Sequence, residues 1–448
     1  MQTFNKNFDQ IRIYKRIDAE FFSPKYDKIL KEIDNSNCED LVSISHVTDG
    51  NHLSIADEFD EKKDGIKYLR GQDVNNLMLL NNHHLVTIPE SFYDSLERSH
   101  IFNKDILISI VGTIGNIALV LNQSEKIVAN CKLAIVRTYE EKIDPYYLYA
   151  FLISRFGQAQ IRKSIRGSVQ TGLVLPDLRL LKIMRFSKKQ EEDISILVKK
   201  GHSKIEESKK IYKQAQELVL KKINFEVINL KKRMSYSVNL KEVNSNKRID
   251  AEFFQPKYEN FMDHLKEFKC EKLDQLVNFE KGVEVGGDKY VEEGVPFIRV
   301  SNITPMDLTE EKYISLETYK SQKQKEAKLN DIFFSKDGTP GISYHFTEEP
   351  KKLIYSGGIL KLSQTKKSVN MDVLSLILNS KIVQIQMERD AGGSIIKHWR
   401  PEQIQNVMIP IFSIDTQNQI SKLIKDSNKL KKEGLETINL AKNFFNNL

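Results

Sequence analysis

The spacing of apolar residues predicts compact mixed domains in two parts of the chain. Apolar residues at helical spacing in Tyr146–Phe156 and Val373–Met387 predict helices beside a sheet. Further helices are expected from Pro24 and Pro256, since proline favours the first helical position. Short β-branched and aromatic runs bounded by Gly, Asn or Asp predict the strands of a mixed sheet; they are Ile106–Val111, Ile117–Leu121, Leu133–Val136, Ile332–Phe334 and Ile359–Leu362.

A different pattern follows each of these parts. Two polar stretches carry apolar or small residues alternately four and three positions apart, which is the spacing of a coiled-coil seam. Small residues at Gly201, Ser208 and Gly434 predict a close approach of two helices. We expect the helices, each about 45 Å long, to pair antiparallel; the alternative is that each packs only on its own domain. The seam residues are Ile194, Val198, Ile205, Tyr212, Val219, Ile420, Ile424, Ile438 and Phe445.

The chain contains the same module twice. Lys15–Tyr26 and Lys247–Tyr258 are identical at eleven of twelve positions. Between such anchors the two copies differ strongly, for example at Asn51–Lys63 against Val283–Glu293. A shared frame with different variable faces predicts two domains of one fold that contact different things.

These patterns predict an α+β protein with two tandem α/β domains of the same fold. Two long helices separate the domains and pair as an antiparallel coiled coil, which gives the chain an approximate two-fold symmetry. The length of 448 residues supports a division, because a single hydrophobic core stops growing below this size. The predicted boundaries are 1–187 for the first domain, 188–225 for the first helix, 226–412 for the second domain and 413–448 for the second helix.

Composition narrows the class of protein. With 40% apolar and 29% charged residues the chain is expected to fold, and no apolar run reaches the roughly 18 residues of a membrane helix. The isolated cysteines Cys38, Cys131 and Cys270 argue against a disulfide framework or a zinc site. We therefore expect a soluble cytoplasmic protein. The formal net charge of +7 is compatible with nucleic-acid binding, although a basic surface has many other causes.

Motifs of catalysis are missing from the sequence. It has no G-x-G-x-x-G, G-x-x-x-x-G-K-[ST], H-E-x-x-H or G-x-S-x-G, and no Asn-Pro-Pro-Tyr-type tetrapeptide. Gly112–Gly115 and Gly338–Gly341 lack the lysine of a phosphate loop and are interpreted as tight turns. His83 and His84 are not expected to bind metal, because neighbouring residues of a strand point apart. We predict neither catalysis nor a metal site in this chain.

Side chains suited to DNA occur in segments predicted as loops. Arg matches the guanine edge and Asn or Gln the adenine edge, while basic and small polar groups hold phosphates. For each of these residues, an ordinary solvated surface role is an equal alternative. The candidate DNA-binding residues are Arg70, Gln72, Asp73, Thr113, Arg166, Ser168, Gln170 and Thr171 in the first copy, and Arg299, Ser301, Asn302, Lys336, Thr339, Ser394, Lys397, His398, Trp399 and Arg400 in the second.

The chain resembles a specificity subunit of a type I restriction-modification system over essentially its whole length. The resemblance is carried by the paired openings, by the closings Gly167–Leu173 and Gly393–Trp399, and by the seam helices that follow. It implies two target-recognition domains, each reading one half of a split site in double-stranded DNA, with the helices setting the gap and docking the methyltransferase subunits. One departure is that Ile395–Trp399 stands where the first copy has Val169–Leu173, so the two closings need not make equal contacts.

The resemblance also implies the partners. Such a subunit is not catalytic and holds no cofactor; it docks two methyltransferase subunits, which bind S-adenosylmethionine and modify adenine, and it joins restriction-translocase subunits. A specificity subunit of a related bipartite methyltransferase-nuclease system is one alternative. A protein-binding scaffold without DNA affinity and an enzyme with an unrecognised active site are the others.

Overall fold

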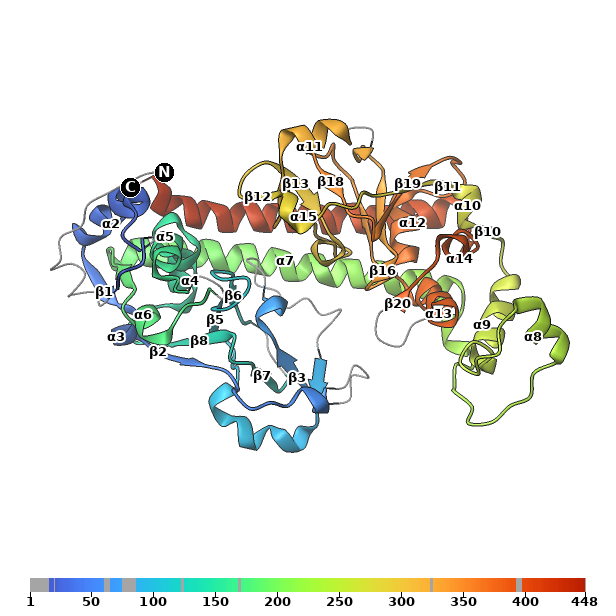
Figure 1. The fold of residues 1–448 in the computed structure, drawn as a ribbon, viewed down its shortest axis with the longest axis horizontal. Coiled ribbons are helices and arrows are strands. Elements are labelled where there is room, and N and C mark those ends of the chain that lie inside the picture. Colours follow the sequence, from blue (N-terminus) through green and yellow to red (C-terminus); the bar gives the residue numbers. More distant parts are fainter. Residues whose placement is uncertain are drawn as a thin grey trace. The chain divides into compact units, whose positions relative to one another are not determined.

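The computed structural model describes residues 16–19, 21–59, 65–74, 86–121, 125–167, 171–322, 325–391 and 397–447 (Figure 1). The chain divides into two compact units. Unit 1 comprises residues 1–206 and 430–448, and unit 2 comprises residues 207–429. Each unit contains part of both long helices, α7 (Lys188–Lys222) and α15 (Ile414–Asn446). No described helix is both long and apolar enough to cross a membrane.

The core of unit 1 lies around a four-stranded antiparallel sheet. Its strand order is β2-β8-β5-β6, and a smaller sheet of order β4-β3-β7 includes the parallel pair β3 and β7. Strands β1 and β9 form a separate antiparallel pair. The strands are β1 (Cys38–Asp40), β2 (Ser45–Asp49), β3 (Ile66–Leu69), β4 (Val86–Ile88), β5 (Ile106–Ser109), β6 (Ile117–Leu119), β7 (Ile127–Ala129), β8 (Leu133–Thr138) and β9 (Lys182–Met184).

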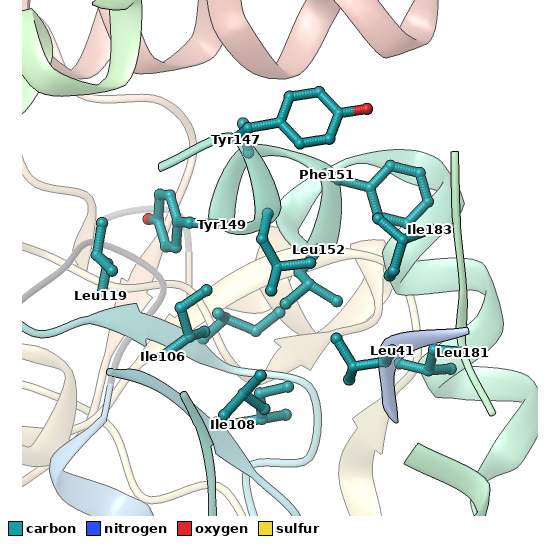
Figure 2. Close-up of a cluster of buried hydrophobic side chains, with 14 of the residues drawn as sticks. Leu41, Ile106, Ile108, Leu119, Tyr147, Tyr149, Phe151, Leu152, Leu181 and Ile183 are labelled. Atoms are coloured by element: carbon teal, nitrogen blue, oxygen red, sulfur yellow. The ribbon is translucent and has the colours of Figure 1, made fainter. Parts of the chain in front are cut away.

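Helix α4 is the central helix of this unit. Pro145 begins it, and the Asp144 side chain caps it by accepting a hydrogen bond from the Tyr146 amide at 2.8 Å. Figure 2 shows its side chains Tyr149 and Leu152 among those of the sheet. The helices are α2 (Asp27–Asp34), α3 (Leu41–Ile44), α4 (Pro145–Ile153), α5 (Arg155–Ser164) and α6 (Leu175–Arg179), with short 3₁₀ turns η1 (Pro24–Tyr26), η2 (Ala56–Glu58), η3 (Gly71–Asp73), η4 (Glu90–Phe92) and η5 (Asp94–Ser99).

Unit 2 repeats this plan. Its main sheet has the order β11-β19-β15-β17, its second sheet the order β12-β14-β13-β18 with a parallel pair β13 and β18, and β10 pairs with β21. The prediction of two domains of one fold is therefore confirmed. The strands are β10 (Cys270–Lys272), β11 (Val277–Lys281), β12 (Tyr290–Val291), β13 (Val295–Ile298), β14 (Tyr313–Ile314), β15 (Ile332–Ser335), β16 (Asp337–Gly338), β17 (Ser343–His345), β18 (Ile354–Tyr355), β19 (Ile359–Gln364), β20 (Lys397–His398) and β21 (Met408–Pro410).

The helices of unit 2 correspond to those of unit 1, with additional elements after α7. Helices α12 and α13 occupy the places of α4 and α5 in the chain order. The helices are α8 (Leu240–Asn246), α9 (Pro256–Lys266), α10 (Leu273–Leu276), α11 (Leu316–Ser321), α12 (Met371–Leu378), α13 (Lys381–Asp390) and α14 (Pro401–Gln405), with 3₁₀ turns η6 (Phe225–Val227), η7 (Gly287–Lys289) and η8 (Val300–Asn302).

The helical runs predicted for 146–156 and 373–387 are each broken into two helices. Ser154 ends α4 and caps α5, whereas Asn379 ends α12 and Ser380 caps α13. Each serine donates to a carbonyl of the preceding helix and accepts from an amide of the next. Serine favours such cap positions because its hydroxyl satisfies backbone groups at helix ends. The apolar spacing continues across the break, so periodicity alone does not reveal it.

The long helices pair antiparallel within unit 1, as predicted. Gly201 of α7 faces Gly434 and Ile438 of α15 so closely that a Cβ added to Gly201 would lie 2.7 Å from the Gly434 carbonyl oxygen. Near the start of α7, Phe186 instead packs on Phe444, at 5.3 Å between ring centroids. In unit 2 the Ser427 hydroxyl donates to the Ser208 carbonyl at 2.8 Å. The small seam residues thus permit the predicted close approach.

The seam residues also belong to the domain cores, so the two hypotheses for the helices were not exclusive. Phe445 contacts Tyr147 and Phe151 of α4, with ring centroids 5.8 and 5.5 Å apart. In unit 2, Val219 and Ile420 join the core around α12. All predicted seam residues are buried except Tyr212, which is half-buried. The helices are therefore structural parts of each unit as well as a coiled coil.

We expect Gly201→Ala to lower the free energy of unfolding by about 1–2 kcal/mol. At an unobstructed helix position, alanine stabilises the fold by about 1 kcal/mol relative to glycine. A lower free energy of unfolding for Gly201→Ala would therefore come from steric conflict with α15. Urea unfolding of the full chain tests this. Ser203→Ala, on the exposed face of the same helix, is the control and should be neutral or slightly stabilising. A Gly201→Ala chain as stable as the control would contradict the close approach.

Candidate nucleic-acid interface

The structure brings three of the predicted segments of unit 1 together at the end of β5. The Thr113 hydroxyl donates to the Gly71 carbonyl at 3.0 Å, which joins the β5–β6 turn to η3. The Leu173 amide donates to the Ile110 carbonyl at 2.9 Å, which joins the closing segment to the same turn. Residues that are about 40 and 60 positions from Thr113 in the sequence thus form one loop cluster.

Unit 2 has the corresponding loop cluster. The Trp399 amide donates to the Lys336 carbonyl at 2.9 Å, and the Lys336 amide donates to the Gly358 carbonyl at the same distance. A Cβ placed on Gly358 would lie 2.9 Å from a methyl group of Val300 in η8 and 3.6 Å from the Cβ of Asp337. The segments after β13, after β15 and before α14 therefore meet, as their counterparts do in unit 1.

The glycine-rich segments are tight turns, as predicted. Gly112 and Gly115 have φ values of 84° and 88°, and Gly338 and Gly341 have 69° and 90°. These left-handed conformations favour glycine because it lacks a Cβ. Among the described residues, a Cβ on Gly112 or on Gly338 would meet no atom within 4 Å. The tip of each turn is therefore open and can approach a large ligand through its backbone.

Two of the predicted base readers are instead structural caps. Asp73 accepts hydrogen bonds from the Arg70 amide at 2.8 Å and from the Arg70 guanidinium at 3.0 Å. Asn302 accepts from the Arg299 amide at 3.0 Å. Asp73 is 4% exposed and Asn302 is 1% exposed, so both residues are buried in their turns. The sequence does not show that these polar groups already have local hydrogen-bond partners, and contact of either residue with DNA stays a prediction.

Trp399 and Lys336 are also placed differently from the prediction. Trp399 is 1% exposed and packs on Phe334, with ring centroids 5.8 Å apart, so it belongs to the core of unit 2. The Lys336 side chain is 11% exposed and pairs with Asp337. Burial by itself would raise the pKa of Asp337, but the bonds from Lys336 and His398 outweigh it and hold that pKa below its ordinary value. Asp337 therefore neutralises part of the local positive charge.

Several predicted residues do present side chains to solvent. Arg166 is 42% exposed and forms an ion pair with Asp177 at 2.7 Å, a bond that raises the pKa of Arg166 further. His398 is 60% exposed and lies 2.9 Å from Asp337. The others that are exposed are Gln72, Thr171, Ser301 and Arg400, while Arg70, Thr113, Arg299 and Thr339 are half-buried.

Some predictions concern residues outside the described part of the chain. These are Ser168, Gln170 and Ser394, the side chain of Lys397, and the pair His83 and His84. Among the residues that are described, no group of three or more His, Cys, Asp or Glu side chains could hold a metal ion. The described cysteines Cys38, Cys131 and Cys270 are free thiols, and burial raises the pKa of Cys270 to about 11.

Lys132 is a candidate that the sequence analysis missed. It is exposed, and its Cβ lies 3.3 Å from the position that a Cβ on Gly71 would occupy. The Lys132 carbonyl accepts from the Ile110 amide at 2.9 Å, which fixes it beside the β5–β6 turn. A basic residue immediately before the predicted strand 133–136 was the available signal.

Comparison with known proteins finds similarity to one family. Residues 31–217 match the type I restriction modification DNA specificity domain. A relative from Methanocaldococcus jannaschii, assigned as the MjaX type I restriction enzyme specificity subunit, is 23% identical over 373 residues, which cover 77% of each chain. The resemblance noted in the sequence is thereby confirmed.

Two solved structures of specificity subunits show weak overall similarity to this chain. The S subunit of a type I restriction-modification system from M. genitalium is 13% identical, with a TM-score of 0.38 over 91% of this chain and 96% of that one. The HsdS subunit from Thermoanaerobacter tengcongensis is also 13% identical, with a TM-score of 0.28 over 91% of this chain and 94% of that one.

We expect Gln72→Ala and Asp73→Ala, although adjacent, to affect different properties of the chain. Gln72 is exposed, so its loss should change stability by about 0.5 kcal/mol or less while weakening any DNA binding by the full chain. Asp73→Ala removes a buried cap and should cost about 1–3 kcal/mol of stability. Thermal melting and DNA affinity, measured on both variants, separate the roles. A stable Asp73→Ala chain would refute the assignment of this residue as a cap.

Proposed function

We propose that this chain, which belongs to the type I restriction-modification DNA specificity family, reads a bipartite site in double-stranded DNA. The observation that carries the proposal is the repeated fold, in which each unit gathers an open glycine turn, a 3₁₀ turn and a closing segment into one loop cluster. Because the residues of the two clusters differ, each unit reads its own half-site.

Within each cluster the roles divide between bases and phosphates. Gln72 and Ser301 are exposed middle residues of the capped turns η3 and η8, so they are held in place to meet base edges. Arg166, His398 and Arg400 are exposed basic residues on or immediately beside the closing segments and would contact phosphates. The open turns at Gly112 and Gly338 allow the backbone to approach the duplex.

The paired helices set the gap between the half-sites. In support of this role, α7 and α15 each contribute to the core of both units. The close contact of Gly201 with Gly434 resists sliding of one helix along the other, because any displacement would force Cβ atoms against backbone. A fixed protein length of this kind imposes a fixed spacing on two DNA half-sites.

The chain acts with partners in the cytoplasm rather than as an enzyme. Two methyltransferase subunits dock on it, bind S-adenosylmethionine and modify adenines, and restriction-translocase subunits complete the complex. No cofactor is assigned to this chain. The proposal thus predicts no methyl transfer by the isolated chain on any duplex.

Selection from random duplexes tests the proposal directly. The full chain, combined with its methyltransferase subunits, should enrich two short sequence blocks separated by one fixed gap. Affinity should fall by about one log unit per log unit of salt for each phosphate that is neutralised. Enrichment of a single block, or of none, would contradict the proposal. Tight binding to another protein without retention of DNA would favour a protein-binding scaffold.

Lengthening both helices together should change the gap alone. A heptad inserted after Glu206 in α7 and another after Lys429 in α15 would extend the pair at the boundary of the units by about 10 Å, or about three base pairs. We expect a wider gap or lost binding, measured by the same selection, with both half-sites unchanged. A heptad in only one helix is the control; it breaks the seam and should lower the melting temperature. A changed half-site would contradict the spacer role.

A further inference from the structure

The glycine turn that follows β5 in unit 1 and the one that follows β15 in unit 2 share a backbone hydrogen bond. The Gly115 amide donates to the Ser109 carbonyl at 3.0 Å, and the Gly341 amide donates to the Ser335 carbonyl at 2.9 Å. The donor follows the acceptor by the same number of residues in both turns. The two turns can therefore be compared position by position.

The residue before the open glycine of each turn pairs with the closing segment of its own unit. Val111 forms an antiparallel bridge with Gly172, and Asp337 pairs antiparallel with His398. Val111 and Asp337 each stand two positions after the serine that accepts the shared hydrogen bond. They therefore occupy the same position of the repeated fold.

This position lies within the loop cluster of each unit. In unit 1 a Cβ on Gly71 of η3 would lie 3.2 Å from the Val111 carbonyl oxygen. In unit 2 a Cβ on Gly358 would lie 3.6 Å from the Cβ of Asp337. Val111 and Asp337 are half-buried, and the glycine that follows each of them is exposed. A duplex that approaches the open glycine would meet the side chain at this position.

The two side chains at this position differ in their chemistry. Val111 is apolar and packs against the core of unit 1. The Asp337 carboxylate accepts from the Lys336 ammonium and lies 2.9 Å from Nδ1 of His398. Burial acts to raise the pKa of Asp337, but these bonds hold that pKa below its ordinary value. An ionised carboxylate offers about four acceptor positions, so this one can accept further hydrogen bonds.

The edges of the bases in the major groove distinguish these two side chains. Cytosine presents an amino donor, adenine presents an amino donor beside an acceptor nitrogen, and thymine presents a methyl group. A carboxylate can only accept, so it matches cytosine and is repelled by the adenine acceptor. A valine cannot form either hydrogen bond but matches the thymine methyl group by apolar contact.

We infer that Val111 and Asp337 are equivalent specificity-determining residues: Asp337 selects a cytosine in the half-site of unit 2, and Val111 selects a thymine in the half-site of unit 1. The inference rests on the proposed function, which assigns one half-site to each unit but names no base. Lys336 and His398 act through Asp337, because they fix the carboxylate and keep it charged. One residue exchanged between identical turns thus lets the two units read different bases.

Selection from random duplexes by the full chain with its methyltransferase subunits tests the inference, using Asp337→Asn. An amide has the shape of the carboxylate but matches the adenine edge. The ratio of adenine to cytosine at one position of the second block should therefore rise about fivefold or more. The other positions of both blocks should keep their bases. The melting temperature of each variant shows whether it is folded during the selection.

A double variant keeps the test valid if Asp337→Asn unfolds the chain by leaving Lys336 without its counterion. Lys336→Ile with Asp337→Val gives unit 2 the two residues that unit 1 carries as Ile110 and Val111, and it removes both charges. This variant should select thymine where the unchanged chain selects cytosine. In unit 1, Val111→Ala should lower the preference for thymine at one position of the first block about threefold, because apolar contact is lost.

Asp274→Asn is the matched control, since Asp274 is an exposed acid of α10 in unit 2 and should leave every base unchanged. A second block without cytosine on either strand, or a folded Asp337→Asn chain that still selects it, would refute the inference while the proposed function stands. Weaker selection spread over the whole second block would show that Asp337 only supports the turn, which also refutes the inference. An unchanged thymine preference in Val111→Ala would refute the assignment in unit 1. Failure of the unaltered complex to enrich two blocks would defeat the proposed function itself.

Discussion

The fold of unit 1 depends on the burial of Phe445 against Tyr147 and Phe151. This contact joins the last long helix to the central helix of a domain that lies more than 290 residues earlier in the sequence. The apolar surface of α4 extends beyond what its own sheet covers, so the domain core is completed by a face of α15. In unit 2, α7 and α15 both join the core around α12 in a corresponding way. Neither domain is therefore separable from the helix pair.

A second constraint is that polar side chains bonded to the backbone hold the helices and strands of each domain together. Gln160 makes two hydrogen bonds to the backbone of Lys182, and Gln386 makes the same two bonds to Met408. Such bonds hold the strand after the closing segment against α5 or α13. Because the frame is repeated in this way, the loops carried on it can diverge without loss of the fold, which is the property that a reader of variable DNA sequences requires.

The frame and the contact surface interleave residue by residue. Gln72 is exposed between Gly71, whose carbonyl accepts from Thr113, and the buried cap Asp73. His398 of β20 pairs with Asp337 of β16, and it is exposed immediately before the buried ring of Trp399. One polar segment thus contains both residues that hold the fold and candidate DNA contacts. The two kinds of residue alternate over one or two positions.

The sequence by itself determined the duplication, five strands of the two main sheets, the tight glycine turns and the seam of the two helices, because each leaves a local or periodic signature. It did not reveal the breaks at Ser154 and Ser380, where apolar spacing continues across a cap. It also assigned Asp73, Asn302 and Trp399 to the surface. Only the tertiary structure decided these cases, since whether a polar group is already satisfied, or a ring already covered, depends on neighbours that are distant in the chain or hidden in a turn.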